Sequence, residues 1–265
     1  GTASAGEIVS LAGLEGVEIG LTLTDPERQD RLEGIAVEEP TISVDFLVNN
    51  SPFAGKEGKY VTSRQIRERL YKELEKNVAL RVEETDSAEN FLVSGRGELH
   101  LGILIETMRR EGFELAISRP RVLYRNDPET GQRLEPIEEV TIDVDDPYTG
   151  VVIEKISMRK GELKDMRPTG AGKTRLVFHA PSRGLIGYHG EFLTDTRGTG
   201  VMNRLFHSYG PYRGPIPGRR NGALIANAEG AAVAYALWNL EERGPMFIEP
   251  GTAVYQGMLI GEHSR

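Results

Sequence analysis

Residues 91–117 read FLVSGRGELHLGILIETMRREGFELAI, and this stretch decides the fold. Phe91–Ser94 has the composition of a short strand. Glu98–Arg110 repeats apolar residues at helical spacing, Gly112 ends that helix, and Phe113–Ile117 is the next strand. The apolar positions of the helix predict a wide buried face made of Leu99, Leu101, Ile103, Ile105 and Met108.

Upstream of this stretch, the sequence predicts a strand, a helix and a second strand. Thr41–Val48 is rich in β-type residues. In Thr62–Lys76 the apolar residues recur every four positions, as on one face of a helix. In Val78–Glu83 apolar residues alternate, as in a half-buried strand. The combined order βαββαβ predicts a ferredoxin-like unit over residues 40–125.

The same order recurs downstream, after a turn at Asn126–Arg133. The predicted elements are strand Glu139–Val144, helix Gly150–Arg159, strands Glu162–Met166 and Thr174–His179, helix Leu185–Thr194 and strand Gly200–Tyr209. Residues 126–210 therefore form a second βαββαβ unit, without a shared sequence repeat. We predict an α+β fold with two ferredoxin-like βαββαβ sandwiches in series.

Both ends of the chain differ from this pattern. Residues 1–39 combine short, glycine-broken β-type runs with a charged segment, which predicts the tail of a β-barrel followed by a linker. The first residue is Gly1, so we expect the sequence to start within a longer protein. Residues 211–265 begin with a Gly/Pro-rich segment and continue as apolar fragments, which we interpret as an incomplete C-terminal domain.

The charge distribution is more informative than the formal net charge of −8. No acidic residue occurs from Thr196 to Ala228, and this window contains Arg197, Arg204, Arg213, Arg219 and Arg220. Such a window is a concentrated basic feature inside an acidic chain. The sequence has no cysteine and no apolar run long enough to cross a bilayer, so we expect a cytoplasmic protein without membrane contact.

No catalytic or metal-binding motif is found. Residues 170–174 imitate the end of a phosphate-binding P-loop, but Arg167 occupies the position of its first glycine, and a strand is predicted where the P-loop has a helix. The guanine-reading motif Asn-Lys-x-Asp is absent as well. The five histidines lack metal-ligand spacing. We expect no cofactor and no GTP hydrolysis in this chain.

Several motifs resemble the elongation factor G family of translational GTPases. Residues 93–101, 108–111 and 119–125 resemble domain III of that family and its exit segment. Residues 181–209 resemble domain V, and residues 5–9 resemble the end of the domain II barrel. Domain IV has no counterpart between Arg125 and Glu139, which leaves the BipA (TypA) and LepA branches. Residues 51–64 and 221–225 are similar to the BipA pattern.

The resemblance implies a ribosome-docking portion of a GTPase whose G domain, with its GTP and Mg²⁺, is not in this sequence. It implies contact with the 50S subunit or 70S ribosome, rRNA and A-site tRNA, action as a monomer, and a role in 50S assembly and in stress or cold adaptation. Arginine binds phosphate in a bidentate manner. The residues that we expect to face RNA are Arg183, Arg197, Arg204, Arg213, Arg219, Arg220, Lys56 and Lys59.

Three alternatives remain open from the sequence. A LepA-like factor would share the domain III and domain V resemblance. A general RNA-binding or assembly module would bind RNA without preference for intact ribosomal subunits. An enzyme with an undetected site would contain a deep pocket with ionisable groups of strongly shifted pKa.

Overall fold

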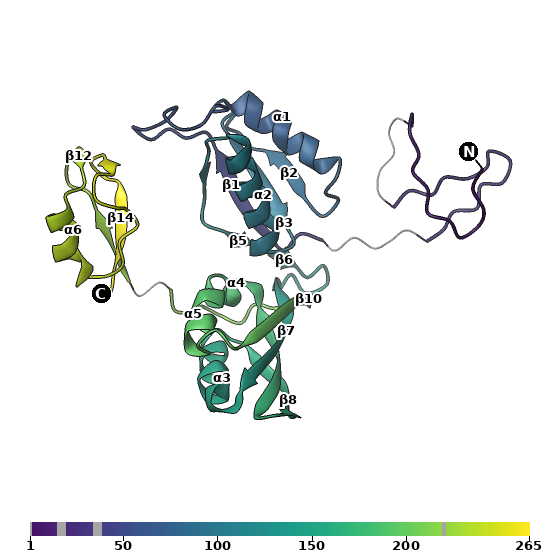
Figure 1. The fold of residues 1–265 in the computed structure, drawn as a ribbon. Coiled ribbons are helices and arrows are strands. Elements are labelled where there is room, and N and C mark those ends of the chain that lie inside the picture. The colour runs from purple at the N-terminus through teal and green to yellow at the C-terminus, as the bar shows by residue number, and fades with distance from the viewer. Residues whose placement is uncertain (1, 15–19, 34–38, 219–220) are drawn as a thin grey trace. The chain divides into compact units, whose positions relative to one another are not determined.

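The computed structural model describes residues 2–14, 20–33, 39–218 and 221–265. The chain divides into two compact units, one made of residues 1–49 and 54–123 and the other of residues 50–53 and 124–265 (Figure 1). Within residues 2–14 and 20–33 there is no helix or strand, only an isolated bridge between Asp25 and Arg28. Residues 15–19 and 34–38 of the predicted barrel tail and linker lie outside the described residues.

The first unit contains one antiparallel sheet with two helices. Its elements are β1 (Ile42–Leu47), α1 (Ser63–Leu74), β2 (Arg81–Glu84), β3 (Asn90–Gly95), α2 (Glu98–Glu111), β4 (Ala116–Ile117) and β5 (Arg121–Val122). The strand order is β2-β3-β1-β4, and β5 also pairs with β1. The element order is therefore the predicted βαββαβ, although β2 begins at Arg81 rather than Val78.

The core of this unit lies between the sheet and the helices, which lie on one face of it (Figure 1). Val44 pairs with Val93 and Phe46 with Phe91, and all four are buried. Helix α1 begins with a capping box, in which Thr62 accepts a hydrogen bond from the backbone N–H of Gln65.

The wide apolar face predicted for α2 was wrong in part. The helix buries Leu101, Leu104 and Met108, which follow one narrow stripe at helical spacing. Leu99 and Ile103 are 77% and 59% exposed, because they lie on the opposite side of the helix.

The Gly-Arg-Gly-Glu-Leu-His motif at 95–100 is a packed turn between β3 and α2. The His100 Nδ1 atom accepts a hydrogen bond from the backbone N–H of Arg96 at 3.2 Å. Since Nδ1 accepts, Nε2 carries the proton and donates to Asn77 Oδ1 at 3.0 Å. A Cβ at Gly95 would lie only 2.8 Å from His100 Nδ1, so the ring needs glycine at this position.

The second unit contains a larger antiparallel sheet. Its elements are β6 (Arg125–Asn126), β7 (Arg133–Asp145), η1 (Asp146–Tyr148), α3 (Thr149–Met158), β8 (Glu162–Gly170), β9 (Lys173–Pro181), α4 (Ser182–Leu185), α5 (Tyr188–Asp195) and β10 (Val201–Pro211). The strand order is β10-β7-β9-β8, with β6 paired to β7. This order is equivalent to that of the first sheet. Lys173 and Thr174 begin the strand β9, as predicted, where a P-loop would continue into a helix.

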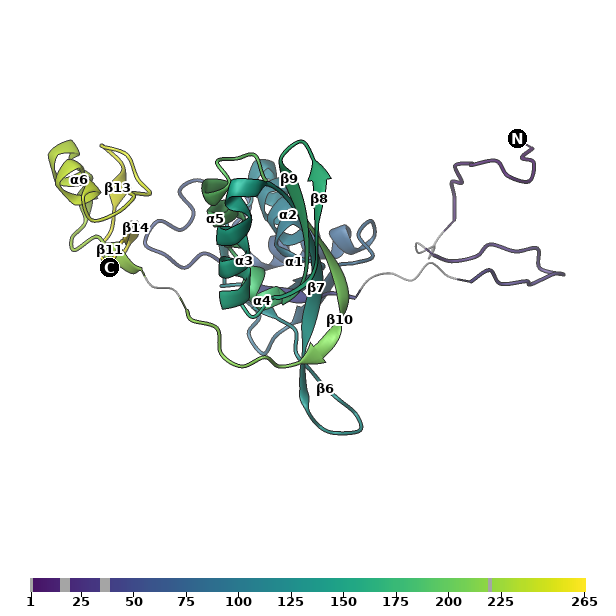
Figure 2. The same ribbon diagram turned by 90° about the horizontal axis from the view of Figure 1, so that it is seen from below.

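The helix predicted over Leu185–Thr194 is divided into α4 and α5. Gly187 has a left-handed φ of 75° directly before α5, which breaks the helix. Helices α3, α4 and α5 lie on one face of the sheet (Figure 2). The core residues on that side are Val140, Ile142, Val144, Val152, Ile156, Leu176, Phe178, Ala180, Leu185, Tyr188 and Phe192.

The last part of the chain forms two small antiparallel sheets and one helix. Its elements are β11 (Gly222–Ile225), β12 (Gly230–Ala231), α6 (Ala234–Glu241), β13 (Ala253–Val254) and β14 (Leu259–His263). Strand β11 pairs with β14 and β12 with β13. A small core forms around Leu224, Ala226 and Ile260. None of the helices in the described ranges is long and apolar enough to cross a membrane.

Two glycines of the second unit provide a matched test of its packing. An alanine Cβ at Gly161 would overlap the side chain of Ile156 and lie 3.2 Å from the Ala180 Cβ. We predict that Gly161→Ala lowers the free energy of unfolding by about 1–3 kcal/mol in urea titrations. Gly150→Ala lies in α3 with no atom within 4 Å of the new Cβ, and should leave stability unchanged or raise it. Equal effects of the two variants would contradict this packing.

Burial of the imidazole, with a smaller contribution from the charge of Arg96, lowers the pKa of His100. Because the pKa of His100 is lower in the folded than in the unfolded state, its contribution to the free energy of unfolding is fully present above pH ~6.5. This contribution is lost as the pH falls from there through the lower pKa of the folded state. We predict that His100→Gln reduces this acid-side loss of unfolding free energy, measured by urea titration at several pH values. The exposed residue His189 supplies the control, because His189→Gln should retain the wild-type pH dependence.

Candidate nucleic-acid interface

The eight residues predicted to face RNA fall into three groups in the structure. Arg183, Arg204 and Arg213 are held by groups of their own unit. Arg197, Lys56 and Lys59 are exposed on loops. Arg219 and Arg220 lie outside the described residues. Lys56 and Lys59 belong to the first unit and the described arginines to the second.

Arg183 forms a bidentate ion pair with Glu135, a carboxylate with no exposed surface. Arg183 Nε and Nη2 donate to the two carboxylate oxygens, the latter at 3.1 Å, and Nη2 also donates to the carbonyl of Gly214 at 2.6 Å. The backbone N–H of Arg213 donates to the same carboxylate at 2.8 Å. A buried charge requires such compensation. Arg183 thus fastens the Gly/Pro-rich segment after β10 to the start of β7.

Arg204 and Arg213 have similar internal partners. Arg204 donates from Nε and Nη2 to Glu138 at 2.7 and 3.0 Å, and the Glu138 side chain is 8% exposed. Arg213 Nη1 donates to the carbonyls of Lys160 at 2.7 Å and His179 at 3.0 Å. Among the described residues, the Arg204 guanidinium group thus ties β10 to β7, and that of Arg213 ties the segment after β10 to β9.

Aromatic rings extend this arrangement. The Arg133 guanidinium lies over Tyr124 at 3.6 Å and near Tyr212 at 5.2 Å, and Arg183 lies over Tyr212 at 4.4 Å. The two tyrosine rings contact edge to face. We call Tyr124, Arg133, Glu135, Arg183 and Tyr212 the arginine–tyrosine cluster. Cation–π contacts of this kind restrict the rotamers of the arginines.

Arg197 is the exposed member of the basic window among the described residues. It occupies the turn between α5 and β10 with a left-handed φ of 51°, which is uncommon for a residue with a side chain. The turn is closed by Gly198, whose N–H donates to the carbonyl of Leu193 at 2.7 Å, and by Thr199, whose hydroxyl donates to Asp145 at 2.7 Å. The Arg197 side chain is therefore presented on a rigid turn.

Lys56 and Lys59 lie on a loop that is fixed by Glu114. The carboxylate of Glu114 accepts backbone N–H groups of Gly55 at 2.6 Å and Glu57 at 3.4 Å, and these contacts lower the pKa of Glu114. Backbone bonds from Lys59 and Tyr60 to the Gly112 carbonyl hold the other end of the loop.

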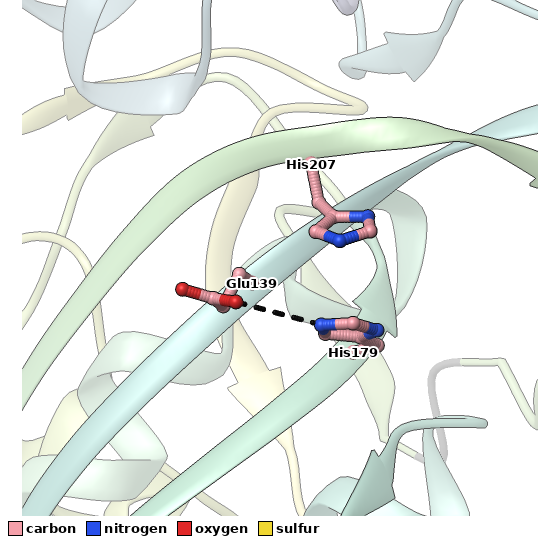
Figure 3. A group of neighbouring side chains, drawn as sticks. All are labelled: Glu139, His179 and His207. Atoms are coloured by element: carbon pink, nitrogen blue, oxygen red, sulfur yellow. Dashed lines mark ion pairs between the residues drawn. The ribbon is translucent and has the colours of Figure 1, made fainter. Parts of the chain in front are cut away.

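Sequence reasoning missed one cluster on the helix-free face of the second sheet. Glu139, His179 and His207 come from β7, β9 and β10 and converge in space (Figure 3). Their spacing along the chain gives no indication of this. A separate pocket in the last part of the chain is lined mainly by apolar residues of α6 and of the segment 244–250, and Glu241 and Glu249 also line it.

Two family models match this chain. The model described as elongation factor G C-terminus matches residues 132–220, and the one described as TypA/BipA C-terminal domain matches residues 221–265. The second sheet and the last part of the chain therefore define a translation-factor chain of elongation factor G type. The second match also favours the BipA branch over LepA.

Curated relatives agree with this class. The proteins named large ribosomal subunit assembly factor BipA from Synechocystis sp., Salmonella typhimurium and Bacillus subtilis are 54%, 53% and 51% identical to this chain over 99% of its length. The chain belongs to the BipA family. It spans less than half of those relatives, 44%, 43% and 43% of their lengths.

The buried pair between Arg183 and Glu135 can be tested by a double-mutant cycle. We predict that Arg183→Met lowers the free energy of unfolding by about 3–5 kcal/mol, because Glu135 is left buried without its partner. Adding Glu135→Leu should recover a large part of this loss, as measured by urea unfolding. As a control, Arg64→Met removes an arginine whose side chain is 87% exposed and should change stability by less than about 0.5 kcal/mol. A double variant no more stable than Arg183→Met would contradict the assigned pairing.

Proposed function

We propose that this chain is the ribosome-binding portion of a large-subunit assembly factor. The support is the family membership: relatives that match 99% of this chain carry the name of a large ribosomal subunit assembly factor. The sequence has no P-loop, so we assign GTP and Mg²⁺ to a G domain outside it, and no catalytic residue to this chain.

We propose that rRNA phosphate is contacted by the exposed cations rather than by the whole basic window. Arg183 and Arg204 already bind buried or nearly buried carboxylates through the Nε and Nη2 atoms of their guanidinium groups. Arg197 combines an exposed side chain with a strained backbone held by its turn, and such outliers suggest function. A pre-positioned arginine loses little freedom when it binds a phosphate in bidentate geometry.

Lys56 and Lys59 form the second proposed contact, with Arg219 and Arg220 as a third. Backbone N–H groups fix the loop of the two lysines, at one end to the Glu114 carboxylate and at the other to the Gly112 carbonyl. A fixed loop suits a contact that recognises the position of a phosphate rather than a base. Such contacts follow the shape and backbone of structured RNA.

We propose that both βαββαβ units are ferredoxin-like sandwiches that act as rigid bodies between a G domain and the ribosome. The proposed partners are the 50S subunit or the 70S ribosome and A-site tRNA, bound by a cytoplasmic monomer. We propose that this activity serves 50S assembly during stress or cold adaptation.

A single substitution can separate ribosome binding from stability. We predict that Arg197→Gly weakens co-sedimentation with purified 50S subunits. The slope of log affinity against log salt concentration should become shallower by about one, since one phosphate contact is lost. The same substitution should leave the unfolding free energy unchanged or raise it by up to about 1 kcal/mol, because glycine adopts the left-handed backbone without strain.

The control is Arg64→Ala, which removes an exposed arginine of α1 and should leave both binding and its salt slope at wild-type values. Wild-type affinity of the Arg197→Gly variant across the salt series would exclude the proposed contact. Arg213 is unsuitable for this comparison, because its substitution would also release the segment after β10 that it fixes.

A further inference from the structure

Three potential metal ligands meet on the helix-free face of the second sheet. Glu139, His179 and His207 each offer one ligand atom, and these atoms all lie within 4.8 Å of one another. In Figure 3 the three side chains, from three neighbouring strands, point toward a common region, and the dashed line joins Glu139 to His179.

The distances are close to those of a ligand set. His179 Nε2 lies 3.5 Å from Glu139 Oε2, about the separation of two ligand atoms that share an ion with bonds of about 2.0–2.2 Å. The two imidazole rings are 4.1 Å apart between centroids and tilted by 40°. A nitrogen of each ring therefore lies within 4.8 Å of the Glu139 carboxylate and of the other ring's nitrogen.

His207 lies on the same face of the sheet as the other two residues, at a β-bulge of β10. Leu205 pairs with Glu139, so the alternation of β10 places Leu205 and His207 on the face of Glu139. The register then shifts from the pair Phe206–Glu138 to the pair Ser208–Ile137, which makes His207 the extra residue of the bulge. Bulges occur often next to functional sites.

The remaining contacts leave the ligand atoms available and orient the rings. His207 Nδ1 contacts the Ser208 hydroxyl at 2.9 Å, which leaves Nε2 for a ligand role. The backbone carbonyl of His179 accepts a hydrogen bond from Arg213, which fixes the strand at this point. A hydrogen bond to the second ring nitrogen, such as the contact of His207 Nδ1 with Ser208, is usual for a histidine that binds a metal.

The named charges around the cluster balance. Glu162 pairs with His179 across β8 and β9, and its carboxylate contacts Lys164 at 2.6 Å and Arg213 at 3.7 Å. The carboxylates of Glu139 and Glu162 together equal the charge of these two cations, and of the four groups it is Glu139 that contacts His179 within the cluster. The His179 side chain is 22% exposed and that of Glu139 44%, so an ion can enter from solvent.

We propose that Glu139, His179 and His207 bind one divalent transition-metal ion, with Zn²⁺ as the best match. Two imidazole nitrogens and one carboxylate oxygen suit Zn²⁺ and its neighbours in the first row, whereas Mg²⁺ and Ca²⁺ prefer all-oxygen ligand sets. Three protein ligands leave a fourth position of the tetrahedron for water or for a donor from a partner molecule. The site requires neither GTP nor a ribosome.

The test is titration of the metal-stripped full chain with Zn²⁺ by calorimetry, and with Co²⁺ by visible absorption. We expect saturable binding of one ion per chain and the absorption bands of tetrahedral Co²⁺. Glu139→Gln, His179→Gln and His207→Gln should each weaken binding by at least about tenfold, by analogy with the loss caused by disrupting metal-site contacts. Far-UV circular dichroism verifies that each variant is folded.

His189→Gln is the matched control, because it removes an exposed histidine of α5 outside the cluster and should bind like the wild type. Two results would overturn the proposal. One is the absence of saturable Zn²⁺ binding to the wild-type chain. The other is equal binding by the wild type and the folded His179→Gln and His207→Gln variants, which would place the ion elsewhere.

Discussion

Glu135 is a carboxylate without exposed surface, and its neutralisation organises the second unit. Arg183 from α4 supplies the compensating charge, and the backbone of Arg213 supplies a further hydrogen bond. One buried anion thereby connects the start of β7, helix α4 and the segment after β10. The stacking of Arg183 on Tyr212 accompanies this arrangement, because the carboxylate fixes the Arg183 guanidinium group over the ring.

Such a pair also changes how the basic window is interpreted. The window contains no acidic residue along the chain, but Glu138 of β7 pairs with Arg204 and Glu162 of β8 contacts Arg213. Local charge counting cannot detect partners that arrive from a distant strand. The exposed positive charge of the described segment is therefore smaller than its sequence indicates, and is presented at a turn and a loop.

The order of helices and strands in both sheets was predictable from apolar periodicity. Alternation in β7 places Val140 and Ile142 toward the helices, and the structure buries both. The same alternation would have placed Glu139 and His179 on the opposite face. In β10 it also places His207 on that face, but the β-bulge that follows gives no distinct sequence signal, so the faces of the residues after His207 could not be predicted. Leu99 shows the converse limit, since apolar composition does not identify which side of α2 the sheet covers.

The bulge in β10 also has a consequence for chain length. The bulge places His207 and Ser208 opposite the single residue Ile137. Without His207, Phe206 opposite Glu138 and Ser208 opposite Ile137 would be consecutive pairs of a regular ladder, so the side chains that follow would keep their faces. Tyr209, which packs under Arg125, and the backbone group that reaches Glu135 both follow the bulge and would keep their partners. The strand can therefore lose one residue at this point without disconnecting the segment that leaves the sheet.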